Sequence, residues 1–164
     1  MSRRGFIAAL AASFMWLAPA MAQQGLRFQT TPDAPLTLSA QNMRWQQTQG
    51  ISDLKGNVRI VQGPMRMRAV TMQIRFASDG TAETIIARGA VELINDDGQR
   101  ATAERADFDI PKDQLVLRDR VRMQTRSAGG ESQNLSGETL SIDMASGHAR
   151  LRGGKTRARI ELER

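Results

Sequence analysis

The sequence predicts an all-β domain, an elongated open roll of repeated antiparallel hairpins around an apolar interior. A short signature recurs with starting residues Ala40, Ala69, Ala103 and Gly137, spaced by 29, 34 and 34 positions, and such a period is typical of repeated units. Apolar and polar residues alternate with period two, as in half-buried strands. Beyond Gln23, no window has the i, i+3, i+4 apolar spacing of a helix.

The first 22 residues have the pattern of a cleaved signal peptide. Arg3 and Arg4 form a positive start, residues 6–17 an apolar run, and Ala20-Met21-Ala22 a small-x-small cleavage site. The apolar run is shorter than the roughly 20 residues that span a bilayer. We therefore expect residues 23–164 to be exported as one domain. The paired arginines also fit a twin-arginine signal, so the general secretory and twin-arginine routes both stay open.

The expected mature chain is modestly basic, with 21 basic and 17 acidic side chains. Nearly all of the basic residues are arginine, whose planar fork suits bidentate contacts with phosphate or carboxylate. An ordinary solvent-exposed surface rich in arginine is the alternative explanation for most of these residues. There is no cysteine, so an exported domain of this kind holds together without disulfides.

The first predicted strands precede residue 63. Leu36 to Ala40 alternates cleanly after a turn at Pro32 and Pro35. Gln49-Gly50 and Gly56-Asn57 interrupt the following pattern, and Gly63-Pro64 closes a hairpin. The strands of this part are therefore expected at residues 36–40, 43–45, 51–54 and 58–62.

The later strands repeat this alternation as far as Met144. They are expected at residues 65–76, 85–89, 91–93, 103–110, 115–117, 121–123 and 140–144. Their hairpin signals are Ser78-Asp79-Gly80, Asn95 to Gly98 and Pro111 to Asp113. Residues 127–134 form the longest polar interruption, which predicts a loop.

Equivalent positions of successive repeats predict how the interior is built. Met72, Ala106 and Leu140 share one face of their strands with the residues two and four positions further on. We expect these positions to stack as apolar ladders. Methionine adapts to irregular apolar shapes, so its frequency in these strands suits flexible hydrocarbon as well as simple core filling; the strand methionines are Met65, Met67, Met72, Met123 and Met144.

The two ends of the roll are expected to be open edges. Leu36 and Leu38 lie in the first strand, and the C-terminal run 156–164 alternates with Ala158, Ile160 and Leu162 on one side. An unpaired edge invites another strand. Pairing of one edge with the opposite edge of another molecule would give head-to-tail assembly.

The sequence predicts no enzyme, no cofactor and no metal site. Its one histidine, His148, lies in a turn-like segment, and cysteine and tyrosine are absent. Asp96-Asp97 beside Gly98 has too few oxygen ligands for calcium and fits hairpin chemistry better. Nucleic-acid binding is not expected either, because the chain lacks aromatic stacking platforms interleaved with its basic residues.

Three stretches resemble a known family, the OstA-like (organic solvent tolerance) domain of lipopolysaccharide transport protein A, LptA. They are Ala34 to Ala40, Gly56 to Gly63 and Ala103 to Asp109, the second being the most specific. The resemblance covers about residues 35–162. The family pattern has an acidic residue where this chain has Gln41 and Val70.

The resemblance implies a twisted antiparallel β-jellyroll with a hydrophobic groove and a location in the periplasm. It implies that the groove holds the acyl chains of lipid A during lipopolysaccharide export, bridging the inner and outer membranes. It also implies an LptC-like partner at the N-terminal edge and an LptD-like partner at the C-terminal edge. Carried onto this sequence, the groove residues are Leu36, Leu38, Val58, Ile60, Val91, Leu93, Phe108 and Ile110.

Two other interpretations stay open. An LptC-like subunit of the same pathway would keep its N-terminal apolar segment as a membrane anchor, and N-terminal sequencing of the exported protein separates it from a cleaved carrier. A lipid-free structural scaffold or adaptor would have the same fold with a packed interior.

Overall fold

The computed structural model describes residues 34–126 and 132–154, and they form nine strands of one antiparallel sheet. The strands are β1 (Leu36–Ser39), β2 (Asn42–Gln46), β3 (Ile51–Gln62), β4 (Met65–Phe76), β5 (Ala82–Ile94), β6 (Arg100–Asp109), β7 (Gln114–Arg126), β8 (Ser132–Asp143) and β9 (Ala149–Arg152). In these ranges the only helix is the short 3₁₀ turn η1 (Gln47–Gln49). The expected signal peptide and C-terminal strand lie outside the described residues.

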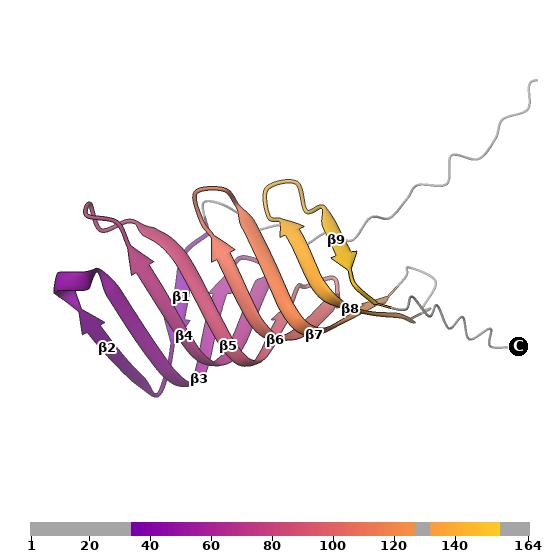
Figure 1. Cartoon of the computed structure of the whole chain (residues 1–164), viewed down its shortest axis with the longest axis horizontal. Helices are drawn as coiled ribbons and strands as arrows, with labels where there is room; N and C mark the ends of the chain where they lie inside the picture. The colour runs from indigo at the N-terminus through magenta and orange to yellow at the C-terminus, as the bar shows by residue number, and fades with distance from the viewer. Residues whose placement is uncertain (1–33, 127–131, 155–164) are drawn as a thin grey trace, which may run out of the picture.

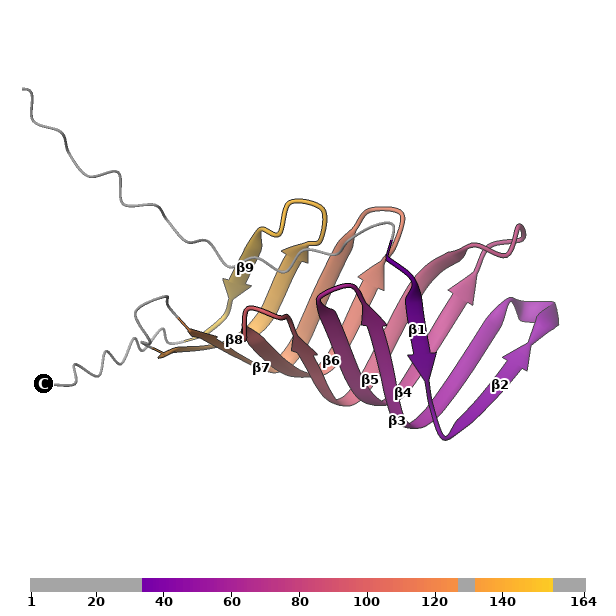
Figure 2. The same ribbon diagram turned by 180° about the vertical axis from the view of Figure 1, so that it is seen from behind.

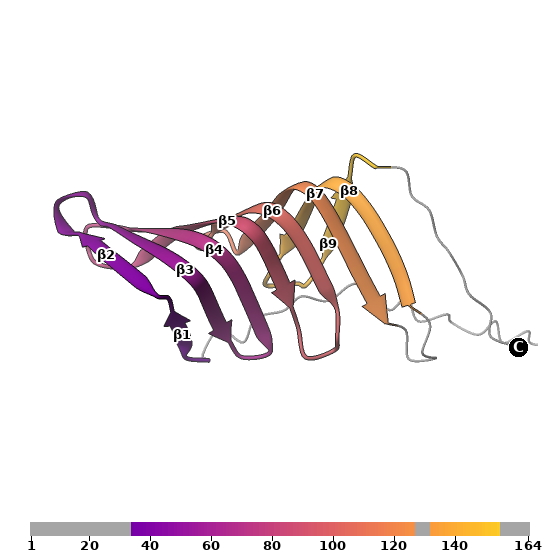
Figure 3. The same cartoon turned by 90° about the horizontal axis from the view of Figure 1, so that it is seen from below.

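The sheet follows the order of the chain and is not closed. From β3 to β9 each strand pairs with the next, while β1 and β2 both pair with β3. One edge is therefore formed by β1 and β2 and the other by β9 (Figures 1 and 2). The long strands succeed one another along the long axis of the molecule and cross that axis at an angle (Figure 3). The predicted all-β, elongated open roll is confirmed.

The long strands are bent in the middle by β-bulges. In β3, β5 and β7, two successive residues have positive φ: Gly56 and Asn57 (78° and 46°), Gly89 and Ala90 (77° and 45°), Asp119 and Arg120 (65° and 53°). Each pair opposes one residue of the next strand, and the register shifts there. An extra residue on one strand bends it and increases the local twist. The two halves of the sheet consequently face each other (Figure 1).

This arrangement corrects two sequence interpretations. Gly56-Asn57 does not separate two strands, because β3 continues through it from Ile51 to Gln62. The expected breaks at residue 90 and residues 118–120 are likewise absent, since β5 and β7 are continuous there. The predicted polar loop is shorter than expected, since β8 begins at Ser132 and pairs with β7 from that residue onwards. The hairpin predicted at Gly63-Pro64 is confirmed.

The predicted apolar ladders are confirmed. The residues predicted to stack lie in β4, β6 and β8, and one residue of β5 or β7 lies between each two of them. Met72 lies between Leu54 and Ala87, and the same row continues through Ala106, Leu117 and Leu140. These side chains are almost completely buried. Burial of this apolar surface is the main force that keeps the two halves of the bent sheet together.

Ala90 offers a test of the bulges. A non-glycine residue in left-handed conformation costs about 1–2 kcal/mol, whereas the flexibility of glycine costs only about 0.5–1 kcal/mol. Ala90→Gly is therefore expected to raise the free energy of unfolding, by up to about 1 kcal/mol on the difference between these terms. Urea denaturation measures the change, with Ala101→Gly, in the regular part of β6, as the destabilised control. A loss of stability in Ala90→Gly equal to that of the control would contradict this account.

Candidate functional site

An apolar cavity lies between the two halves of the bent sheet. Its volume is about 50 Å³, and packed side chains fill most of the surrounding interior. Among its lining residues, Gln62 alone carries a polar side chain. The lining consists of Leu36, Ile60, Gln62, Met65, Met67, Ile85, Leu93, Ala106, Phe108, Leu115 and Met144.

The strand register builds two facing walls. One wall is the row Ile60, Met67 and Leu93, contributed by β3, β4 and β5 on the C-terminal side of the bend in β3 and β5. The other contains Ile85, Phe108 and Leu115 of β5, β6 and β7, beyond the bend. β5 contributes to both walls, since its bulge turns its two halves toward each other. Sheet pairing in the described residues runs only along each wall, so apolar contacts alone join the walls across the cavity.

The structure divides the eight predicted groove residues into three groups. Four line the cavity: Leu36, Ile60, Leu93 and Phe108. Val58 and Val91 are completely buried next to the bulges, where the walls meet. Leu38 and Ile110 are partly buried and pack against the core.

Three methionines, Met65, Met67 and Met144, line the cavity although they are outside the predicted groove set. The signal that could have found them is their place in alternating strands. The sequence had already indicated that these methionines suit flexible hydrocarbon.

The N-terminal edge carries an apolar surface. Met43 and Trp45 of β2 pair with Leu54 and Ser52, which places them on the inner face of the sheet. They are nevertheless 61% and 52% exposed, because the sheet ends there. Trp45 also meets Phe76 edge to face, with ring centroids 5.0 Å apart.

Both predicted edges can be compared with the sheet. Leu36, which is 51% exposed, and Leu38 lie in β1, an edge strand as expected. The predicted C-terminal edge residues Ala158, Ile160 and Leu162 lie outside the described part of the chain. Within that part, the last strand is β9, which pairs with β8 only. Met43 and Trp45 were missed as edge residues because an apolar residue at an alternating position looks like core.

Two aspartates order turns rather than forming a reactive site. The side-chain and backbone hydrogen bonds that Thr81 donates to Asp79 lower the pKa of this carboxyl group. The backbone N–H of Ser146 donates to Asp143 at 2.8 Å and likewise lowers its pKa. His148 is exposed and lies 2.9 Å from the Ser146 hydroxyl through Nδ1. Asp96 forms an ion pair with Arg66.

The described residues contain no group of three or more acidic, histidine or cysteine side chains that could hold a metal ion. Among the same residues, no helix is long and apolar enough to cross a membrane.

Comparison with known proteins agrees with the fold. A family model described as LptA/(LptD N-terminal domain) LPS transport protein matches residues 37–148. One similar solved structure is LptH, the LptA-homologous periplasmic component of the lipopolysaccharide transport device of Pseudomonas aeruginosa. It superposes with a TM-score of 0.60 at 17% identity, over 78% of this chain and 93% of that one. No curated protein matches the chain.

The resemblance identified from the sequence is thereby confirmed. The match extends from β1 to the turn before β9 and includes both walls of the cavity. Because it spans more than half of the sequence, the chain belongs to the family of LptA and LptD N-terminal domains, the lipopolysaccharide transport proteins.

Proposed function

We propose that this protein is a periplasmic carrier that binds the acyl chains of lipopolysaccharide between the two walls of its bent sheet and passes them toward the outer membrane. The observation that carries the proposal is the apolar cavity in a sheet whose two edges are open. Energy for transport comes from outside this chain in this proposal, since no nucleotide-binding motif is found in the sequence.

The size of the cavity sets the binding mechanism. A volume of about 50 Å³ is too small for acyl chains, since pockets for drug-sized ligands measure about 300–1,000 Å³. Binding therefore requires the walls to move apart. This motion breaks no sheet hydrogen bonds between the walls, and acyl chains replace the apolar contacts that are lost. The flexible methionines Met65, Met67 and Met144 adapt the lining to its occupant.

The open edges support the proposed partners. The backbone of β1 and β2 pairs on one side only within the described residues, and Leu36, Met43 and Trp45 expose apolar surface beside it. An added strand would satisfy the free backbone groups and cover these side chains. We assign this edge to an LptC-like protein and the opposite edge to an LptD-like protein. Pairing between the two edges of different copies gives head-to-tail self-association and a bridge between the membranes.

Site-specific photocrosslinking tests the carrier function. A photoreactive amino acid replaces Phe108, on a cavity wall, or Arg75, which is exposed on the outer face of β4. Lipopolysaccharide is expected to crosslink at position 108 and not at position 75. Equal capture at both positions, or none at either, would contradict binding in the cavity.

The tight packing of the interior favours one other candidate, a lipid-free adaptor that acts only through its edges. The same experiment separates the two functions. An adaptor would show protein crosslinks at β1 and β2 and no lipid crosslink at position 108.

A further inference from the structure

The outer corner of the bent sheet carries a line of basic residues. On one side of the bulges, a continuous row of paired residues across β3 to β9 contains Lys55, Arg88, Arg105, Arg118 and Arg152. On the other side, the nearest row contains Arg59, Arg68 and Arg122. We call these two rows, together with the bulge residues between them, the ridge.

The positive charge of the domain is concentrated on the ridge. It holds nine basic residues, the eight above and Arg120, against four acidic ones, Glu92, Glu104, Asp119 and Glu138. The rest of the described chain has seven basic and nine acidic residues, so the ridge has a net charge of +5 and the remainder −2.

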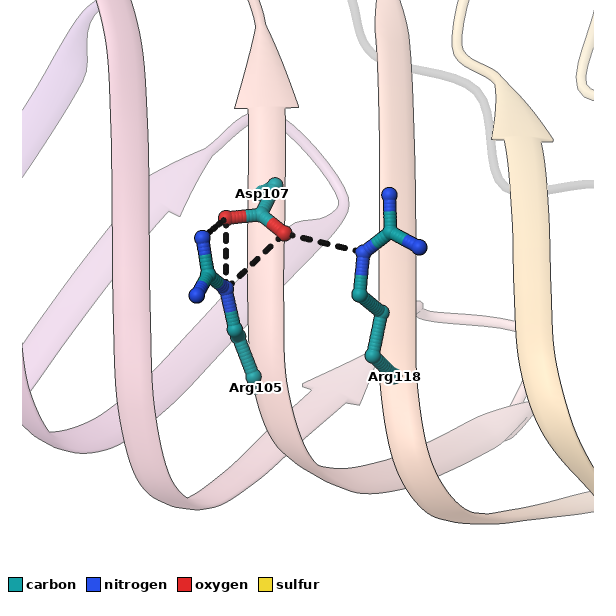
Figure 4. A network of polar contacts seen from close by, with 3 residues as sticks. All are labelled: Arg105, Asp107 and Arg118. Carbon is teal, nitrogen blue, oxygen red and sulfur yellow. Dashed lines mark hydrogen bonds and ion pairs between the residues drawn. The ribbon is translucent and has the colours of Figure 1, made fainter.

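Two carboxylates on or beside the ridge, Asp107 and Glu92, each hold two arginines, and Glu104 holds Arg120. Asp107, two residues further along β6 on the same face, accepts hydrogen bonds from Arg105 Nε at 2.8 and 3.0 Å and from Arg118 Nε at 3.1 Å (Figure 4). The bond to Asp107 raises the pKa of Arg105. Glu92 likewise pairs with Arg68 and Arg100.

Such exposed ion pairs add little to stability, but they orient the guanidinium groups. Each unit of two arginines and one carboxylate also keeps a positive charge, with N–H groups left for further acceptors.

We propose that the ridge docks the protein on an anionic lipid bilayer, with its arginines on headgroup phosphates. From Lys55 to Arg152 the row crosses six strand spacings, which is about 29 Å at ~4.8 Å each. A cationic row of this length matches an extended anionic surface better than a single small anion. Of the large apolar side chains, only Val70 is strongly exposed at the ridge, so binding is electrostatic and does not involve insertion.

The ridge is separate from the cavity. Ridge side chains lie on the outer face at the bends, whereas the cavity is lined by inner-face residues. The ridge and the cavity are therefore on opposite faces of the sheet. The inference does not rest on the proposed carrier function, and its failure would leave that function intact.

Vesicle co-sedimentation of the full chain tests the proposal, with phosphatidylcholine vesicles compared with phosphatidylcholine mixed with phosphatidylglycerol. The ridge variant combines Arg59→Gln, Arg88→Gln and Arg122→Gln, three exposed residues that form no ion pair within the described ranges. The matched control removes the same charge elsewhere, with Arg44→Gln, Arg75→Gln and Arg150→Gln, which are also exposed and form no ion pair within the described ranges. Circular dichroism and thermal melting confirm that both variants fold.

The full chain is expected to bind the anionic vesicles only, and more weakly as salt rises. At about fivefold per arginine, the ridge variant should lose roughly a hundredfold in partitioning, while the control binds almost as before. Equal loss in both variants would show an effect of net charge and overturn the proposal. So would an absence of binding to phosphatidylglycerol, or binding only when lipopolysaccharide is present in the vesicles.

Discussion

Replacing Ile60 with aspartate is expected to abolish binding of lipopolysaccharide while the edge strands stay intact. Ile60 lines the cavity and is 8% exposed, in the row that forms one wall. A carboxylate there must lose its water when acyl chains enter. An unpaired charge in apolar surroundings costs several kcal/mol, so affinity should fall by about a hundredfold or more. Binding of fluorescent lipopolysaccharide to the purified chain measures the loss.

Two further variants distinguish a loss of lipid binding from a loss of folding. Val61→Asp places the same charge on the next residue of β3, on the outer face of the sheet, and should bind lipid normally. Ala106→Leu fills the cavity without a charge, since Ala106 is 1% exposed and lines it; overpacking of this kind costs about 1–3 kcal/mol of stability. Unchanged lipid binding in a folded Ile60→Asp and in Ala106→Leu would exclude the cavity as the site.

Leu117→Ala is expected to produce a large loss of stability, about 2–5 kcal/mol. Leu117 is completely buried, between Ala106 and Leu140 in a ladder that crosses the sheet. Truncation leaves a void, and the rows on both sides cannot collapse into it without shifting the strand register. Against a typical total of about 5–15 kcal/mol, this is a substantial fraction. Urea denaturation followed by circular dichroism gives the difference in unfolding free energy.

Val116→Ala is the natural comparison, because Val116 is the neighbouring residue on the outer face of β7 and is only partly buried. We expect it to cost less than about 1 kcal/mol. If both substitutions were equally mild, the ladder would not be the structural core.

The ladders could be predicted from the sequence, because side-chain direction in a strand follows directly from period two. Met72, Ala106 and Leu140 occupy one row for this reason. The bends could not. A glycine in left-handed conformation occurs both in tight hairpin turns and in β-bulges. Which of the two forms depends on how many residues of the neighbouring strand lie opposite the glycine, and the local sequence does not contain that information. Asp119 and Arg120 adopt the same conformation without any glycine.

The cavity was predictable only in part for a related reason. Val58 has the same parity as Ile60, and Val91 the same as Leu93, yet in each pair only the second residue lines the cavity. The distance between the walls grows away from the bend, so position along the strand decides between core and cavity. Periodicity carries no information on that distance.

The regular placement of the bulges has a consequence for how such a domain can change in size. Since β3, β5 and β7 bend at equivalent positions, each hairpin presents the same profile to its neighbour. Duplication or deletion of one whole hairpin would leave every remaining interface with a matching partner. The space between the two walls of the sheet can thus be lengthened or shortened by whole hairpins, and its cross-section stays the same each time.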